Sequence, residues 1–161
     1  MAFIHSLMLV YRISRTKWAH SLDGEGARLH GGRWNHIGTP CVYTSESRAL
    51  AILEYTVNAN VDDIPRALSI VTINIPDENA VNFFMAPVSS LPGDWRDSPR
   101  AGSTRNFGTD LLKKNFHGLI FPSVIIQREF NYVLNPLQST GYSFRVIDVE
   151  DFVYDLRIKT A

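Results

Sequence analysis

The sequence Gly-Ala-Arg-Leu-His-Gly-Gly-Arg-Trp-Asn occupies residues 26–35 and is the most distinctive stretch of this chain. It lies within a polar, glycine-rich segment, residues 14–40, for which the residue pattern predicts one long loop. Loops of this length without structure of their own are uncommon in compact domains and usually have a function. We therefore expect this segment to contribute to a functional site as well as to connect two strands.

The charge in this part of the chain favours an anionic ligand. Residues 1–48 contain six basic and three acidic side chains, whereas the whole chain balances sixteen against sixteen. An arginine guanidinium binds phosphate oxygens through two parallel charge-assisted hydrogen bonds. The alternative is that these arginines only tie the loop through salt bridges. The overall neutrality does not indicate a nucleic-acid partner, because proteins that grip nucleic acid usually have a basic surplus.

Length and composition describe an ordinary globular protein. The 161 residues favour one domain spanning residues 1–161, and a hydrophobic content of 45% argues against disorder. No apolar run approaches the roughly 20 residues that a membrane span needs. Residues 1–11 lack the basic region of a signal peptide, so the expected location is the cytoplasm. Cys41, the single cysteine, lies among apolar residues and is expected to be a buried, inert thiol.

Along the whole chain, predicted strands outnumber predicted helices. One helix is expected from an N-cap at Ser45 to about Asn58, because apolar residues recur there at the spacing of one helical face, with Glu54 beside that stripe. A short helix is expected over residues 109–115, after a loop over residues 87–108. The expected strands span residues 8–13, 41–44, 68–75, 118–121, 130–134 and 142–149. Since most of these strands are not separated by helices, the pattern favours an α+β fold.

Residues 26–35 are the first of several elements that occur in a characteristic order. They are followed by Gly38, the pair Val42-Tyr43, the helical stretch 49–54, the triplet Phe121-Pro122-Ser123 and the stretch 131–136. In order and spacing this series resembles the RES domain, a family named for an arginine, a glutamate and a serine. The resemblance extends over about residues 11–152 and assigns these three residues to Arg28, Glu54 and Ser123.

The resemblance implies a fold, an activity and partners. RES domains resemble ADP-ribosyltransferases, with a split β-sheet and flanking helices around an NAD⁺ cleft. They are toxins of bacterial toxin–antitoxin pairs whose antitoxin is an Xre-like helix-turn-helix protein. They deplete NAD⁺ by cleaving its nicotinamide–ribose bond, as glycohydrolases or phosphorylases. Some members instead transfer ADP-ribose to a protein such as a phosphoribosyl-pyrophosphate synthetase.

The chemistry of NAD⁺ suggests a role for each candidate residue. Arg28, with Arg33 as a second candidate, would bind the phosphates, and Tyr43 would stack on the nicotinamide ring. Cleavage of the N-glycosidic bond passes through an oxocarbenium-like state, which the carboxylate of Glu54 would stabilise. Ser123 is expected to position the nicotinamide amide or the nearby ribose, without acting as a nucleophile.

Three other residues within the elements of this series are expected to be structural. Trp34 is expected to anchor the loop, and Asn131 and Asn135 are expected to hold turns together. No metal site is expected, because the five histidines lack ligand spacing.

Three functions remain open from the sequence. The favoured one is NAD⁺ cleavage with water or phosphate as the acceptor of ADP-ribose. The second is transfer of ADP-ribose to a protein target at the same pocket. The third is a non-enzymatic module that binds only an antitoxin or a nucleotide.

Overall fold

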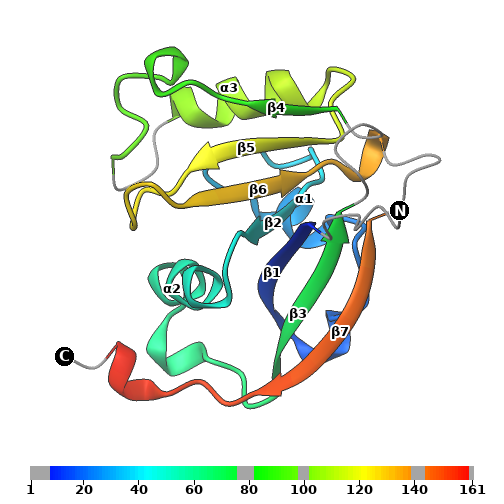
Figure 1. The fold of residues 1–161 in the computed structure, drawn as a ribbon. Helices are drawn as coiled ribbons and strands as arrows, with labels where there is room; N and C mark the ends of the chain where they lie inside the picture. Colours follow the sequence, from blue (N-terminus) through cyan, green and yellow to red (C-terminus); the bar gives the residue numbers. More distant parts are fainter. Residues whose placement is uncertain (1–7, 76–81, 98–101, 139–143, 160–161) are drawn as a thin grey trace, which may run out of the picture.

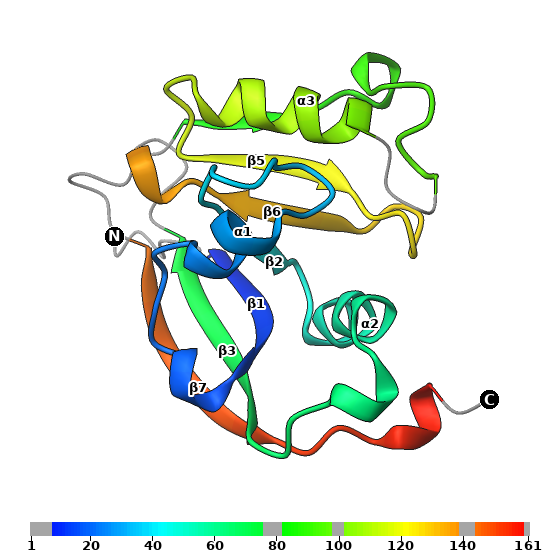
Figure 2. The ribbon, with the colours of Figure 1, turned by 180° about the vertical axis from the view of Figure 1, so that it is seen from behind.

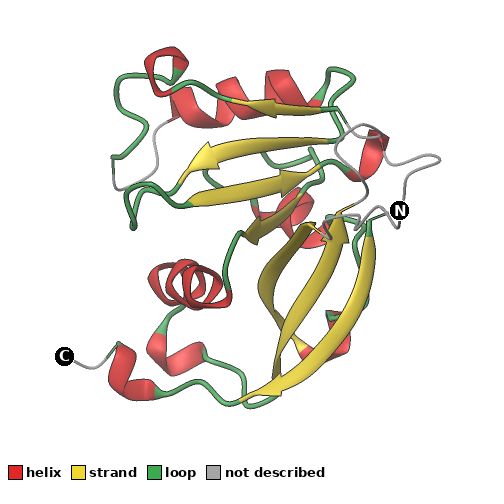
Figure 3. Cartoon of the chain, viewed as in Figure 1, coloured by secondary structure: helices red, strands yellow, loops and turns green. Residues whose placement is uncertain are grey.

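The strands form one mixed sheet. The computed structural model describes residues 8–75, 82–97, 102–138 and 144–159 (Figure 1). Within this part of the chain, the strand order is β4-β5-β6-β2-β1-β3-β7. The strands are β1 (Met8–Arg15), β2 (Val42–Ser45), β3 (Leu68–Ile75), β4 (Phe83–Met85), β5 (Gly118–Pro122), β6 (Phe130–Leu134) and β7 (Arg145–Phe152). The helices are α1 (Glu25–His30), α2 (Arg48–Asn58) and α3 (Gly102–Leu112), with short 3₁₀ turns between elements (Figure 3).

The sheet divides into two halves between β2 and β1. These two strands share a single register pair, Tyr11 with Ser45. By contrast, β1 and β3 pair at every residue from Met8↔Ile75 to Arg15↔Leu68. The half made of β4, β5, β6 and β2 therefore diverges from the half made of β1, β3 and β7, and α2 lies beside the opening (Figure 1). The α+β class and the split sheet are both confirmed.

Two hydrophobic clusters hold this arrangement together. One cluster joins the two halves, with Val10, Val71 and Ile73 of one half in the same core as Val42 and Leu134 of the other. The second lies between β5, β6 and α3, and includes Trp34, Leu112 and Phe121. Burial of each such side chain contributes about 1.5–3 kcal/mol. The glycine-rich segment is therefore attached to the core through Trp34.

Two predicted strands, β3 and β6, are confirmed residue for residue. The predicted start of the long helix is wrong by two residues. The N-cap is Ser47, whose Oγ accepts a hydrogen bond from the backbone N of Leu50 at 3.1 Å. Ser45 instead ends β2, because the pairing of β2 with β6 continues through Ser45 and Asn131.

The prediction of one unbroken loop over residues 14–40 is also wrong. The segment contains a 3₁₀ turn at Thr16–Trp18 and the helix α1. Gly24 and Gly31 border α1 with φ angles of 73° and 67°, in the left-handed region that glycine adopts without strain. Figure 2 shows this segment crossing the sheet on the far side from Figure 1, with α1 near β2 and β6.

The helix expected over residues 109–115 is longer and begins earlier, as α3 over Gly102–Leu112, so the end of the expected loop over 87–108 is helical. The strand β4 was not expected, and it has only three residues. The strand expected over 142–149 is found as β7, while residues 139–143 lie outside the described part of the chain. Most of the N-terminal stretch 1–11 also lies outside it.

The environment of Cys41 agrees with the sequence prediction. The side chain is 2% exposed, and burial raises the pKa of its thiol to about 12. A thiol with such a pKa remains protonated, and therefore unreactive, at neutral pH. Within the described residues, none of the helices has the length and apolar character needed to cross a bilayer.

Gly108 of α3 provides a test of how the helix is packed against the loop. A Cβ at this position would lie 2.0 Å from the backbone O of Trp34. We expect Gly108→Ala to lower the free energy of unfolding by about 1–3 kcal/mol, because helix and loop would have to separate. Gly102→Ala is the matched control, since nothing lies within 4 Å of its Cβ. Urea denaturation of both variants measures the difference, and equal stabilities would contradict this packing.

Candidate active site

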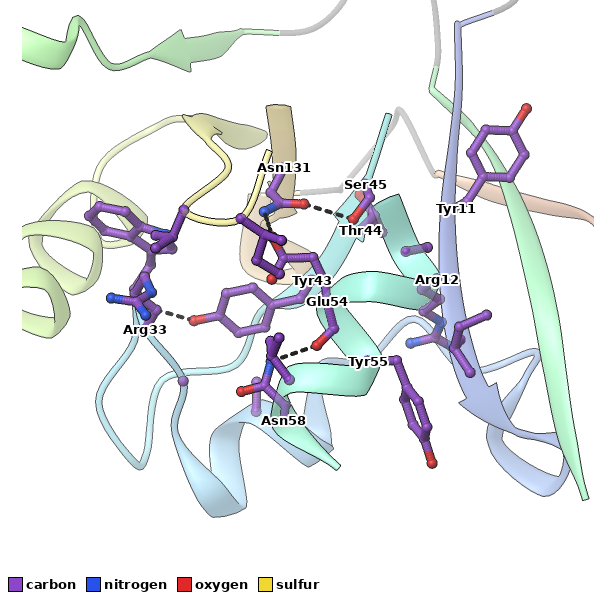
Figure 4. Close-up of a pocket in the computed structure, with 18 of the residues that line it drawn as sticks. Tyr11, Arg12, Arg33, Tyr43, Thr44, Ser45, Glu54, Tyr55, Asn58 and Asn131 are labelled. Carbon is purple, nitrogen blue, oxygen red and sulfur yellow. Dashed lines mark hydrogen bonds between the residues drawn. The ribbon is translucent and has the colours of Figure 1, made fainter. Parts of the chain in front are cut away.

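A cavity of about 800 Å³ opens where the two halves of the sheet diverge. Its volume lies in the range of about 300–1,000 Å³ that is usual for small-molecule sites. The cavity is bordered by β1, β2, α2, the residues after α1 and the turn after β5 (Figure 4). Its lining includes Tyr11, Arg12, Gly32, Arg33, Tyr43, Glu54, Tyr55, Asn58, Arg96, Arg105, Ile125 and Asn131.

Glu54 is the carboxylate of this cavity, and one of its two oxygens is anchored. Its Oε1 accepts hydrogen bonds from Ser123 Oγ at 3.0 Å and from Asn131 Nδ2 at 2.6 Å. Its Oε2 receives no hydrogen bond from the described residues. The side chain is therefore held in one orientation while its second oxygen is available to a ligand.

Ser123 acts on the cavity through Glu54. The residue is 3% exposed and is not among those that line the cavity. Its Oγ accepts hydrogen bonds from the backbone N of Ile125 and of Ile126, at 3.0 and 3.2 Å, and donates its only hydrogen to Glu54. This geometry is that of a group that positions Glu54, and a direct contact of Ser123 with nicotinamide or ribose stays a prediction.

Asn131 belongs to the site, and the expectation that it only holds a turn is wrong. It lies on β6, where its amide bridges Glu54 and Ser45: Nδ2 donates to Glu54, and Oδ1 accepts from Ser45 Oγ at 2.7 Å (Figure 4). Ser45 is its register partner on β2, which sets the direction of the amide. The signal in the sequence is that Asn131, the second residue of β6, is polar while the other residues of this strand are apolar. Asn135, in contrast, holds a turn as predicted, donating to the carbonyls of Leu112 and Phe116.

Tyr43 lines the cavity with its hydroxyl fixed at the far end. The hydroxyl donates to Asn35 Oδ1 at 2.7 Å and accepts from the backbone N of Trp34 at 2.9 Å. Gly32 packs against the ring, where a Cβ would come within 2.5 Å of the phenol oxygen. Trp34 is itself stacked on Phe121 with ring centroids 3.8 Å apart, which confirms its role as the loop anchor. Stacking of Tyr43 on a bound ring stays a prediction.

The two arginines expected to bind phosphate lie in different surroundings. Arg33 lines the cavity, and its Nη1 donates to the backbone O of Trp95 at 2.8 Å and of Asp97 at 3.2 Å. Arg28 lies on α1 beside lining residues but is not one of them. Its guanidinium donates two hydrogen bonds to Glu25, at 2.7 and 2.6 Å, and this pairing lowers the pKa of the Glu25 carboxyl. A phosphate contact by Arg28 therefore requires exchange of this exposed salt bridge.

The chemistry of the site is that of a positively lined cavity with one oriented carboxylate. Such a site suits an anionic ligand on which positive charge develops during reaction. In the described part of the chain, no three histidine, cysteine or acidic side chains are grouped in a way that could hold a metal ion.

Comparison with known proteins identifies the family. The sequence matches the RES domain family over residues 9–155. It is 33% identical over 157 residues to a protein named Toxin Res from Photorhabdus laumondii subsp. laumondii, covering 96% of this chain and 99% of that protein. It is 34% identical over 146 residues to a protein named Prs ADP-ribosylating toxin from a Sphingobium species, covering 90% of this chain and 91% of that protein.

The fold is also found in a solved structure. The crystal structure of the M. tuberculosis MbcT–MbcA toxin–antitoxin complex contains a chain that superposes with a TM-score of 0.73 at 21% identity, over 93% of this chain and 86% of that one. The sequence relatives align over almost their whole length, and the family match spans nearly all of this sequence. This chain therefore belongs to the RES domain family of toxins.

Proposed function

We propose that this protein is a cytoplasmic toxin that binds NAD⁺ and cleaves the bond between nicotinamide and ribose. The observation that supports this most directly is Glu54, anchored through Oε1 and open to a ligand at Oε2, within a cavity of suitable size. Two of its sequence relatives bear the names Toxin Res and Prs ADP-ribosylating toxin, and ADP-ribosylation uses the same bond cleavage.

The reaction requires a negatively charged group beside the ribose. As the N-glycosidic bond breaks, its electron pair passes to the pyridinium nitrogen, and neutral nicotinamide leaves. Positive charge then develops on the ribose carbon and ring oxygen, where a carboxylate stabilises it. Glu54 Oε2 accepts a hydrogen bond from a ribose hydroxyl, which holds the sugar beside the charge. Addition of water gives ADP-ribose and a proton, whereas addition of phosphate gives a phosphorylated ADP-ribose.

The remaining candidate residues have supporting roles in this proposal. Tyr43 presents its ring to the nicotinamide, since its hydroxyl is already bonded to Asn35 and Trp34. Ser123 positions Glu54 and, through the resemblance, is also proposed near the nicotinamide amide. Arg33 and Arg28 are proposed to bind the phosphates, with Arg28 doing so only after release of Glu25.

The proposed partner is an antitoxin of the Xre-like helix-turn-helix class that covers the cleft. This rests on the family resemblance and on the similar fold seen in a toxin–antitoxin complex. We propose no direct contact with nucleic acid or membrane.

Transfer of ADP-ribose to a protein is the second candidate function. It is favoured by the 34% identity to the Prs ADP-ribosylating toxin. The target would be a protein such as a phosphoribosyl-pyrophosphate synthetase. Cleavage would use the same carboxylate, and only the acceptor would differ.

Replacement of Glu54 tests the proposed cleavage. Glu54→Gln keeps the shape of the side chain but removes its charge, so we expect the rate of NAD⁺ loss to fall about 100-fold or more. The measurement is nicotinamide release from NAD⁺ by purified protein. Glu150→Gln is the matched control, because Glu150 lies on β7 and is paired with Arg48 outside the cavity lining. Equal activity of the two variants would disprove the role of Glu54. If the wild type does not cleave NAD⁺ with water, phosphate or protein as the acceptor, a binding module is favoured.

A carboxyl in place of the Asn131 amide tests how Glu54 is held. In Asn131→Asp the hydrogen-bond donor to Glu54 Oε1 is replaced by a carboxyl oxygen, and two adjacent carboxylates repel each other. We therefore expect a large loss of activity, greater than in Asn131→Ala, which removes the hydrogen bond without adding charge. Nicotinamide release by both variants and the wild type checks this, and wild-type activity in Asn131→Asp would argue against the bridge.

The acceptor is tested by following the ADP-ribose half of the substrate. With NAD⁺ labelled in the adenine ring, we expect soluble ADP-ribose in plain buffer and a phosphorylated product when phosphate is added. Label in a protein band after incubation with cell lysate would instead identify the transferase. Glu54→Gln serves as the control in each case, because all three reactions need the same bond to break.

A further inference from the structure

Three arginines form one wall of the cavity. Arg33, Arg96 and Arg105 all line it, and they are connected through backbone contacts. Arg33 Nη1 donates to the carbonyls on either side of Arg96, those of Trp95 and Asp97. Arg105 Nε, on α3, donates to the carbonyl of Gly32, the residue before Arg33, at 3.3 Å. We call these three residues the arginine wall.

Arg33 and Glu54 lie on opposite sides of Tyr43. Figure 4 shows the ring of Tyr43 between Arg33 and Glu54. Glu54 is the only carboxylate among the described residues that line the cavity. The cavity therefore has one negative group, Glu54, with Arg33 on one side of it and Arg12 of β1 on the other (Figure 4).

Arg96 and Arg105 have N–H donors that no described residue accepts. In the described part of the chain, neither Arg96 nor Arg105 lies within salt-bridge distance of a carboxylate. The guanidinium of Arg96 lies 4.8 Å from the centre of the Trp95 ring, and Trp95 is buried, so stacking orients the charge while leaving its N–H groups free. Arg105 uses only Nε in its bond to Gly32.

The fourth arginine that lines the cavity, Arg12, binds backbone carbonyls of its own segment. Its Nη2 donates to the backbone carbonyls of Trp18, Ala19 and Ser21, which ties β1 to the following segment. Arg28 has its guanidinium paired with Glu25. Arg12 Nε is buried without a hydrogen-bond partner, but its Nη2 is fixed by these three carbonyls, so Arg96 and Arg105 are the cavity arginines whose Nη groups make no hydrogen bond to the described residues.

We propose that the arginine wall is a diphosphate subsite, with Arg96 and Arg105 as its principal ligand-binding side chains. Arg96 and Arg105 line the same cavity without a carboxylate partner among the described residues, and such guanidinium groups produce a local positive potential that a diphosphate neutralises. This inference rests on the proposed function in one respect, because it identifies the diphosphate with that of NAD⁺. The substrate then lies with its nicotinamide ribose at Glu54 and its diphosphate beyond Tyr43, toward α3. The principal phosphate contacts are thereby assigned to Arg96 and Arg105, which lie outside the family motif, with Arg33 of the motif beside them.

Binding of uncleaved ligands tests the subsite separately from catalysis. We would titrate the wild-type protein calorimetrically with ADP-ribose, ADP and adenosine. Arg96→Ala is the cleanest variant, because Arg96 makes no hydrogen bond to the described residues. We expect it to weaken ADP-ribose and ADP about tenfold, as expected for loss of a charge-assisted hydrogen bond, and to leave adenosine unchanged. Arg105→Ala should have a similar effect, and Arg145→Ala, an exposed arginine on β7, is the matched control.

Each outcome decides the question. Unchanged ADP-ribose affinity in Arg96→Ala and Arg105→Ala, or an affinity lowered only by Arg28→Ala, would overturn the assignment. Failure of the wild type to bind ADP or ADP-ribose would also overturn it. If the wall variants lose ADP-ribose while the wild type does not cleave NAD⁺, the diphosphate subsite stands and the proposed cleavage falls. Should Arg105→Ala lower thermal stability, Arg96→Ala alone decides the result.

Discussion

The buried amide of Asn35 is the interaction on which the site depends. Its Nδ2 donates to the carbonyls of Ala27, His36 and Thr39, and its Oδ1 accepts from the hydroxyl of Tyr43. The residue is completely buried. A buried polar group that loses its partner costs about 1–3 kcal/mol, so this side chain strongly favours one arrangement of α1, the loop and β2. The positions of Tyr43 and of Arg33 in the cavity follow from that arrangement.

The split in the sheet creates the space that the loop borders. Because β1 and β2 meet at one register pair, the two halves separate, and α2 is placed beside the gap with Glu54 toward the cavity. Glu54 then meets Ser123 and Asn131, which are 69 and 77 residues away in sequence. A partly buried carboxylate needs such partners, since desolvation without hydrogen bonds is unfavourable. Fold and site are thus coupled: the opening exposes Glu54, and the neighbouring strands anchor it.

The charged side chains that line the cavity are arranged asymmetrically. Arg33 and Arg105 lie where the loop meets α3, Arg12 lies on β1, and the carboxylate lies between α2 and β6. In a site partly removed from water, fixed charges act more strongly than they do in solution. A ligand with a negative diphosphate and a developing positive sugar would therefore bind in one orientation. Tyr43 separates the two regions and so sets the distance between them (Figure 4).

The sequence by itself determined those features that local pattern encodes. β-Branched and apolar residues before Pro76 located β3, the helical stripe located α2 and placed Glu54 at its edge, and the apolar surroundings of Cys41 predicted its burial. Motif order alone sufficed to indicate the family. The strands, the helix and the burial of Cys41 depend on neighbours within a few residues, whereas the family was indicated by the order of motifs along most of the chain.

Tertiary structure alone decided the remainder. Helices α1 and α3 were missed or shortened because glycines that appear helix-breaking in sequence are required for caps and for contact with Trp34. Asn131 joins the site only because β2 and β6 pair in one register. The motif indicated Arg28 as the phosphate ligand, and only the structure shows that its guanidinium is paired with Glu25 and that Arg96 and Arg105 line the cavity. Strand pairing and close packing involve residues distant in sequence, such as Asn131 with Ser45 and Gly108 with Trp34, so a local pattern does not predict them.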